Sequence, residues 1–130
     1  MSDLFNILSL SASGMAAQAS RLRHVSENIA NADTPGYQRK TAAFEQIMEQ
    51  GKKTGAVQSG PVELDQTPVK KVFDPGHPLA AEDGYYSGSN VEIMVEIADA
   101  REAQRSYEAN LKMFDQARQM STSLLDLLRR

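Results

Sequence analysis

The sequence contains no cysteine and no tryptophan, and it has only two histidines among its 130 residues. Without cysteine the chain cannot form a disulfide, a zinc–thiolate site or a thiol nucleophile. Aromatic residues make up only 6% of the chain, which argues against a large globular core. No apolar run approaches the ~18 residues that a membrane-spanning helix needs, so we expect no membrane span.

The chain also lacks clustered charge of one sign. Its net charge is −3, and no block of five like charges occurs. Nothing in the charge pattern therefore points to a nucleic-acid surface or to an anionic membrane. The first ten residues include Asp3 and no basic residue, unlike a signal peptide. We therefore expect a protein that is either cytoplasmic or exported without a cleaved signal peptide.

Proline and glycine divide the chain into three regions. Four of the five prolines and six of the eight glycines lie between Tyr37 and Asn90, which rules out a long helix there. We expect an N-terminal assembly helix at 1–32, a turn motif with a loop-rich middle segment at 33–89, and a C-terminal assembly helix at 90–130.

The middle segment predicts short strands. Residues 56–64 and 69–73 have the composition of strands and are bounded by turn residues. The residues Phe44, Ile47 and Met48 have helical spacing, but a helix of one or two turns is marginal by itself. This part of the segment therefore remains ambiguous at the level of sequence.

The first region has one glycine and no proline, and its apolar residues recur every seven positions from Met1 onward. This spacing predicts an amphipathic helix with a heptad-like stripe, which Asn31 can stop by adopting a left-handed conformation. The residues expected to form an assembly interface on this helix are Leu4, Leu8, Met15, Leu22, Val25 and Ile29.

The last region has neither glycine nor proline and predicts a longer helix. Asn90 is a plausible N-cap, and Arg129 and Arg130 suit the negative end of the helix dipole. The expected interface residues here are Ile93, Ile97, Tyr107, Leu111, Phe114, Met120, Leu124, Leu125 and Leu128.

A second apolar edge runs beside the stripe of the last helix, and it comprises Met113, Ala117, Met120, Leu124 and Leu127. The predicted fold is mainly α, with the two terminal helices packed as a coiled-coil-like pair and a small middle segment containing short strands. Such a pair covers one stripe on each helix and leaves the second edge exposed. Contiguous exposed apolar surface usually marks a partner site.

Neither histidine has the surroundings that catalysis requires. A histidine base needs an orienting acid and a nearby nucleophile. Around His77 the candidates for these roles are Asp74 and either Ser87 or Ser89, and their spacing matches no known catalytic motif. Proline and glycine explain that segment better as a turn, and His24 reads as a surface or interface side chain. We expect no catalytic, metal-binding or cofactor-binding residues.

One short motif is more specific, and it follows the first helix. A type II turn is predicted at Thr34-Pro35-Gly36-Tyr37, because proline presets φ at its second position and glycine supplies a positive φ at its third. The complete motif consists of Asn28, Ala30, Asn31, Thr34, Pro35, Gly36 and Tyr37.

The motif resembles the N-terminal signature of bacterial flagellar rod and hook proteins, in which a long helix ends in an Asn-x-Ala-Asn…Thr-x-Gly-Tyr segment. The start of the last region, from Ser89 to Glu92, and the run from Ala103 to Asn110 resemble the closing helix of that family. The segment from Val72 to Ala80, followed by Asp83-Gly84-Tyr85, is similar to the proximal-rod subunits in particular.

The resemblance implies a structural subunit of the proximal rod, located in the periplasmic part of the flagellar basal body. Such subunits polymerise through their terminal helices into a drive shaft and export-channel wall. The implied partners are copies of the chain, other rod and basal-body proteins and the flagellar type III export apparatus, with no nucleic acid, small-molecule substrate, cofactor or membrane span.

Two alternatives remain open from the sequence. The turn from Asp33 to Gly36 is shorter than in many proximal-rod proteins of this type, and this departure keeps another rod subunit of the same family as an alternative. A generic coiled-coil adaptor would also explain the helices, although it would have no need for the motif from Asn28 to Tyr37.

Overall fold

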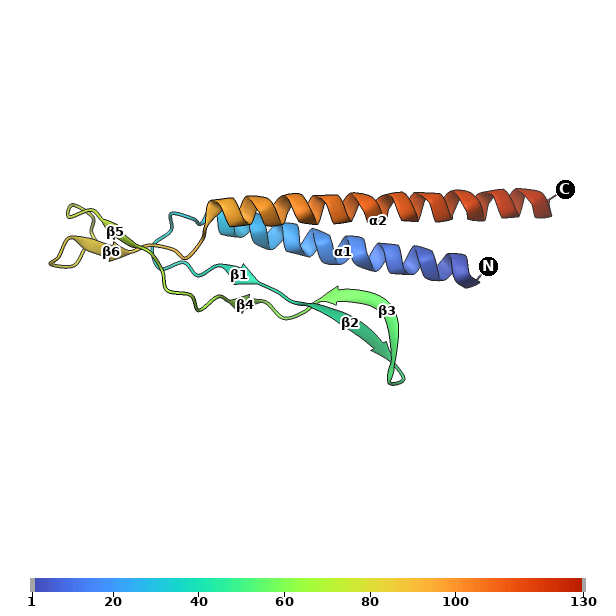
Figure 1. Ribbon diagram of the computed structural model, residues 1–130, viewed down its shortest axis with the longest axis horizontal. Helices are drawn as coiled ribbons and strands as arrows, with labels where there is room; N and C mark the ends of the chain where they lie inside the picture. Colours follow the sequence, from blue (N-terminus) through green and yellow to red (C-terminus); the bar gives the residue numbers. More distant parts are fainter. Residues whose placement is uncertain (1, 130) are drawn as a thin grey trace.

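The computed structural model describes residues 2–129 and is dominated by two long antiparallel helices (Figure 1). Helix α1 spans Ser2–Ala30, and helix α2 spans Ile93–Leu128. The start of α1 and the end of α2 lie at the same end of the molecule. The predicted pairing of the terminal helices in a mainly α fold is confirmed. Met1 of the expected stripe and Arg130 of the expected helix end lie outside the described residues.

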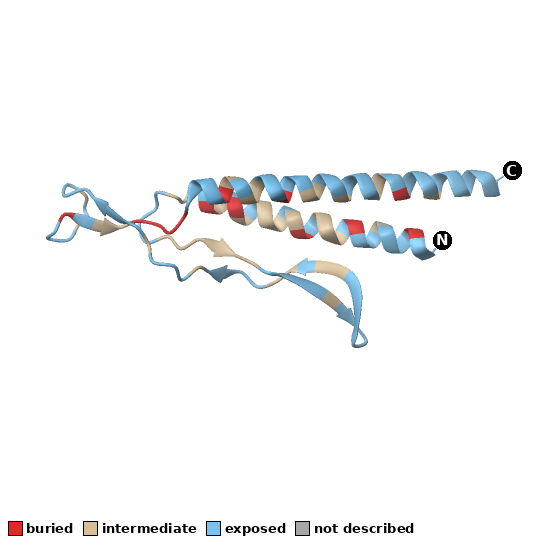
Figure 2. Cartoon of the chain, viewed as in Figure 1, coloured by how far each residue is buried: buried red, intermediate tan, exposed pale blue. Residues whose placement is uncertain are grey.

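Small side chains make the central contact between the helices. Ser11 and Ala17 on α1, and Ala103 and Ala117 on α2, are at most 3% exposed. Figure 2 shows the buried residues on the facing sides of the two helices. Small residues at such a seam allow the two backbones to approach closely, so larger side chains lie on either side of it.

The register of this seam on α2 differs from the predicted stripe. Its members are Glu96, Ala103, Asn110 and Ala117, which are spaced seven residues apart as a heptad repeat requires. The predicted stripe, from Ile93 and Ile97 onward, flanks the seam. The difference arises because the sequence prediction followed large apolar residues, whereas close helix contact here selects small ones.

Three small antiparallel sheets of two strands each form the described part of the middle segment. Strand β1 (Lys40–Thr41) pairs with β4 (Glu63–Leu64), β2 (Phe44–Glu49) pairs with β3 (Lys52–Ser59), and β5 (Lys71–Phe73) pairs with β6 (Tyr85–Ser87). The ambiguity around Ile47 is resolved in favour of a strand. A two-residue turn causes this outcome, because Gln50 and Gly51 both have positive φ (51° and 76°), as a tight hairpin requires.

The prediction of one continuous strand over 56–64 is wrong. Strand β3 begins earlier and ends at Ser59, and β4 pairs with a different partner. Pro61 separates them, since it has no N–H to donate to a ladder. The prediction at 69–73 is confirmed in its second half by β5.

The β2–β3 hairpin lies along the side of α1 (Figure 1). The Val57 amide donates to Ser13 Oγ at 3.3 Å, and Gly55 faces the Leu10 side chain. The hairpin is otherwise mostly exposed (Figure 2). No helix in the described part of the chain is long and apolar enough to cross a membrane.

A notch in α1 fixes the two helices against each other. A Cβ atom at Gly14 would lie 2.8 Å from Asn110 Nδ2 and 2.9 Å from its Cγ. Moving the Asn110 side chain aside would break a hydrogen bond, because its Nδ2 donates to the Ser106 carbonyl at 2.9 Å. Glycine is therefore required at this position by close approach.

Replacing Gly14 by alanine should lower the free energy of unfolding, although alanine favours a helix by ~1 kcal/mol. Overpacking against Asn110 costs about 1–3 kcal/mol and outweighs that gain. In an Asn110→Ala background the same change should instead stabilise the protein. Urea denaturation of the four variants measures this reversal of sign. A stabilising effect of Gly14→Ala in both backgrounds would contradict the close contact.

Candidate functional site

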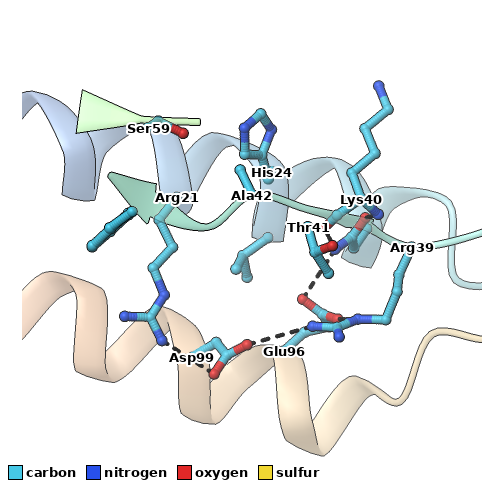
Figure 3. Close-up of a pocket in the computed structure, with 12 residues that line it drawn as sticks. Arg21, His24, Arg39, Lys40, Thr41, Ala42, Ser59, Glu96 and Asp99 are labelled. Atoms are coloured by element: carbon cyan, nitrogen blue, oxygen red, sulfur yellow. Dashed lines mark hydrogen bonds and ion pairs between the residues drawn. The ribbon is translucent and has the colours of Figure 1, made fainter. Parts of the chain in front are cut away.

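A buried carboxylate lies where α2 begins and joins three separate segments of the chain. Glu96 is fully buried, at 0% exposure. Its Oε1 accepts a bond from Arg39 Nε at 2.7 Å, and its Oε2 accepts one from Asn28 Nδ2 at 3.3 Å. We refer to Asn28, Tyr37, Arg39, Asn90 and Glu96 as the base cluster (Figure 3 shows part of it). Satisfying this carboxylate is essential, because an unpaired buried charge is very costly.

Asn28 is the member of the base cluster that ties α1 to the chain returning from the turn. Its Oδ1 accepts bonds from the Tyr37 hydroxyl and the Lys40 amide, both at 2.8 Å. Its Nδ2 also donates to the Lys40 carbonyl at 3.0 Å. Only a side-chain amide offers donors and an acceptor in this arrangement, so Asn28 has a structural reason to be asparagine.

The predicted type II turn is confirmed. Gly36 has a φ of 74°, and the Tyr37 amide donates to the Thr34 carbonyl at 3.2 Å. The Gly36 amide has its acceptor outside the turn, since it donates to the Gly88 carbonyl at 3.0 Å. The turn is thereby fastened to the segment that enters α2.

The proposed conformation of Asn31 was wrong, since the described non-glycine residue with positive φ is Gln50. Asn31 acts through its side chain instead. Its Nδ2 donates to the Glu27 carbonyl at 2.8 Å, and its Oδ1 accepts from the Thr34 hydroxyl at 3.1 Å. It thus adds a second bond to the Glu27 carbonyl, which also accepts the Asn31 amide at 3.1 Å, and it links the end of α1 to the turn.

The prediction that Asn90 caps α2 was also wrong. The capping position is Glu92, which makes no side-chain capping bond. The Asn90 side chain instead accepts the Arg39 amide at 2.7 Å and donates to the carbonyls of Asp65 and Thr67 at 2.9 and 3.0 Å. It therefore holds the residues that precede β1 and follow β4 against the start of α2.

Charges of opposite sign alternate around the base cluster. Arg39 also contacts Asp65 at 3.4 Å and Asp99 at 3.5 Å, while Arg21 reaches Asp99 at 3.3 Å from α1. Burial opposes the charge of Arg39, but its bonds to Glu96 and Asp65 outweigh burial and raise its pKa. Arg39 therefore remains cationic, and the two arginines connect α1, the residues just before β1, and α2.

Two carboxylates beside the cluster have lowered pKa values. Thr67 donates its hydroxyl and its amide to Asp65 Oδ1 at 2.6 and 2.9 Å, and these bonds are the main cause of the low pKa of Asp65. Lys40 bonds Glu27 at 2.8 Å, which lowers the pKa of Glu27 and raises that of Lys40. The charged forms of both carboxylates are thus favoured by folding.

The expected interface residues fall into three groups by exposure. Two are buried between the helices, namely Leu4 and Val25. Six are half-buried, namely Leu8, Met15, Leu22, Ile97, Tyr107 and Phe114. Seven are exposed, namely Ile29, Ile93, Leu111, Met120, Leu124, Leu125 and Leu128.

Both histidines contact nearby side chains or backbone groups. His77 stacks on Tyr86 with ring centroids 4.0 Å apart, and its Nδ1 accepts from the Leu79 amide at 3.1 Å. His24 lies 3.4 Å from the Ser20 hydroxyl, beside a cavity of about 90 Å³ at the base cluster (Figure 3). Among residues 2–129, no group of three or more His, Cys, Asp or Glu side chains could hold a metal ion.

Sequence reasoning identified Asn28 and Tyr37 but did not single out Arg39, Asp65 or Glu96 as a site. One signal was present. Glu96 is the first of a series of positions on α2 that are spaced seven residues apart and that include Ala103 and Ala117. An acidic side chain at such a buried position needs a partner that pairs with its charge.

Two protein-family models match this chain. Residues 8–38 match the family model "Flagella basal body rod protein", and residues 82–127 match the model "Flagellar basal body rod FlgEFG protein C-terminal". The first match contains Asn28 and Tyr37, and the second contains Asn90 and Glu96. The base cluster thus joins the two matched segments.

Whole-chain relatives give the same result. A protein of Agrobacterium fabrum is 40% identical over 92% of this chain and 91% of its own length. Relatives from Salmonella typhimurium (35% identical, 95% and 97%) and Aquifex aeolicus (39% identical, 88% and 89%) match over similar shares of the two chains. All three are named flagellar basal-body rod protein FlgC.

Removal of the buried carboxylate should destabilise the whole fold. We expect Glu96→Ala to lower the free energy of unfolding by about 3 kcal/mol, because it leaves Arg39 and Asn28 without their buried partner. Urea denaturation measures the loss. Glu102→Ala is the matched control on the same helix, since this exposed residue should cost less than about 1 kcal/mol. Equal effects of the two variants would refute a special role for Glu96.

Stability should also depend on Asp65 and pH. Because folding lowers the pKa of Asp65, its contribution is complete above the unfolded value of about 3.9 and disappears as the pH falls through the lower folded value. Asp65→Asn should therefore be less stable than the natural chain at pH 7, and this gap should narrow below about pH 4. Urea denaturation across this range tests the prediction, with Asp126→Asn as the control. If the difference in stability between Asp65→Asn and the natural chain did not change with pH, the proposed coupling between Asp65 protonation and folding would be ruled out.

Proposed function

Since the chain belongs to the FlgC family of flagellar basal-body rod proteins, it is a structural subunit of that rod, and we propose that it polymerises through its terminal helices. Its partners in this proposal are copies of itself and other rod and basal-body proteins. The assembled subunits form the drive shaft and the wall of an export channel. Membership of a structural rod family also means that the chain is not an enzyme.

The observation that carries the proposal is the exposed apolar end of α2. Leu124, Leu125, Leu127 and Leu128 are between 41% and 77% exposed, and their spacing places them on one broad face of the helix, which spans about 160° of its circumference. A contiguous exposed apolar surface of this kind usually marks a site of interaction with a partner. Burying such a leucine stabilises an assembly by ~1.5–3 kcal/mol at most, before the cost of ordering the partners.

The base cluster gives this assembly a mechanical joint. Glu96 connects α2 to α1 through Asn28 and to the middle segment through Arg39. Buried charge-assisted bonds of this kind have well-defined geometry. We infer that a load applied to the terminal helices is passed through this joint to the middle segment.

The proposal also covers the location of the subunit and the route by which it is exported. The subunit would lie in the periplasmic part of the rod and would be delivered by the flagellar type III export apparatus without a cleaved signal peptide. Family membership supports this extension. Inactivation of the export apparatus should then trap the chain in the cytosol, and cell fractionation would detect this change. Normal delivery to the periplasm in such cells would exclude this route.

The assembly surface can be tested separately from folding. Leu128→Asp changes a residue that is 77% exposed in the free subunit, so it should alter the free energy of unfolding by less than about 0.5 kcal/mol. Leu111→Asp changes a residue that is 40% exposed and should lower the free energy of unfolding by about 1–2 kcal/mol. Both should nevertheless prevent incorporation into basal bodies and abolish motility. Gln104→Asp, at an exposed polar position of α2, should retain both properties.

Two outcomes would contradict the proposal. One is normal swimming of cells that carry either leucine variant. The other is recovery of the natural chain only from the cytosol, which is the behaviour expected of a coiled-coil adaptor.

A further inference from the structure

The β2–β3 hairpin packs beside α1 but buries none of its own residues. Its two strands run along the side of the helix (Figure 1), and every residue from Phe44 to Ser59 is exposed or half-buried (Figure 2). A hairpin of two strands is only marginally stable unless it packs against another element. The position of this hairpin therefore depends on the helix surface beside it.

The contact between the hairpin and α1 is small and comes from β3. The Val57 amide donates to Ser13 Oγ at 3.3 Å. A Cβ atom at Gly55 would lie 3.4 Å from a methyl group of Leu10, so the strand backbone rests on that side chain. A contact of this size is broken and remade at low cost.

The hairpin is joined to the rest of the molecule by a short connection. Residues 42–43 and 60–62 lie between the β1–β4 and β2–β3 ladders. The Gly60 amide donates to the Ala43 carbonyl at 2.7 Å across this connection, and Pro61 has no N–H to add to it. A cavity of about 90 Å³ is lined by the connection and by both helices (Figure 3). Short connections of this kind favour the exchange of an element between copies.

The hairpin is long enough to reach a neighbouring subunit. Strand β2 has six residues, and a strand rises by roughly 3.3 Å per residue, so the hairpin extends about 20 Å beyond the connection. A helix is about 10 Å across. If the terminal helices of two subunits lie side by side, the hairpin of one therefore reaches α1 of the other.

Every copy of the chain carries the same hairpin and the same surface on α1. The structure shows that these two surfaces fit each other within one chain, so they also fit between two chains. Exchange of an identical element between copies has a low cost because the contact itself does not change. Each copy can give its hairpin to the next copy and receive one from the copy before, and this pattern links subunits without limit.

We propose that in the assembled rod the β2–β3 hairpin of one subunit packs on α1 of a second copy of this chain, through the same contact that it makes on its own α1 in the free subunit. This inference rests on the proposed function, because it requires that copies assemble with one another. It assigns Leu10 and Ser13 to the accepting helix and Gly55 and Val57 to the donated strand.

The absence of cysteine from the chain allows a direct test. Ser13→Cys and Val57→Cys chains are produced together in cells that also make the natural chain, and the purified basal bodies are oxidised mildly. Each variant chain has one cysteine, so a bond between positions 13 and 57 joins different copies. We expect a covalent dimer on a non-reducing gel, with the joined positions identified by peptide mass spectrometry.

A mixture of Ala19→Cys and Val57→Cys chains is the matched control. Ala19 is exposed on α1 and lies about 120° around the helix from Ser13, so this mixture should give no dimer. A second mixture, Leu10→Cys with Ala56→Cys, keeps the test decisive if the first pair does not enter basal bodies. A short bismaleimide cross-linker replaces oxidation if the two sulfur atoms are not aligned for a disulfide.

The double variant Ser13→Cys/Val57→Cys distinguishes the two arrangements within one chain. As a free subunit it should form an internal bond and remain monomeric, whereas in basal bodies it should form covalent oligomers. Internal bonds alone in basal bodies would overturn the inference. So would an equal yield of dimer in the Ala19 control, no cross-link in either mixture, or cross-links only to another basal-body protein.

These results separate the inference from the proposed function. If any of the overturning results is obtained while Leu128→Asp still blocks assembly, the proposed function stands and only the exchange of the hairpin is refuted. Absence of the natural chain from basal bodies would overturn both.

Discussion

The rest of this small structure is arranged so that a single buried carboxylate has the partners that it needs. Glu96 is fully buried near the start of α2, where a charge is tolerated only with nearby partners. Arg39 supplies one partner and Asn28 the other. These residues are far apart in sequence, so the turn between α1 and β1 must bring them together.

The details of the turn follow from this requirement. Asn31, Thr34 and Gly36 end α1 and reverse the chain within a few residues. Tyr37 then bonds Asn28, and the backbone of Arg39 bonds Asn90. The motif that resembles a flagellar signature is thus a set of contacts that position one cation against one carboxylate. The two matched family segments, 8–38 and 82–127, meet at this point.

The sequence was sufficient to predict the features that depend on local preferences. Both long helices follow from apolar periodicity and the absence of proline, and the turn at Pro35-Gly36 follows from the φ preferences of those two residues. The base cluster could not be predicted in this way. Arg39 and Asp65 have several possible partners in sequence, and only the tertiary fold places them beside Glu96.

The seam and the hairpin were missed for different physical reasons. Large apolar residues suggested the contact surface of α2, but the helices approach closely at Ala103 and Ala117. Around Ile47, a two-residue turn at Gln50-Gly51 decided between helix and strand, although glutamine gives little indication of positive φ. Tertiary packing and turn geometry therefore overrode the local apolar pattern.

The pairing of Asn110 with Gly14 limits how the two helices can move under load. A displacement of one heptad along the helices would carry Asn110 away from the only glycine in α1 and toward positions that bear side chains. The same displacement would separate Glu96 from Asn28. Lengthwise slip is therefore opposed at two separate places, by steric contact between Asn110 and α1 and by the buried charge of Glu96 near the start of α2.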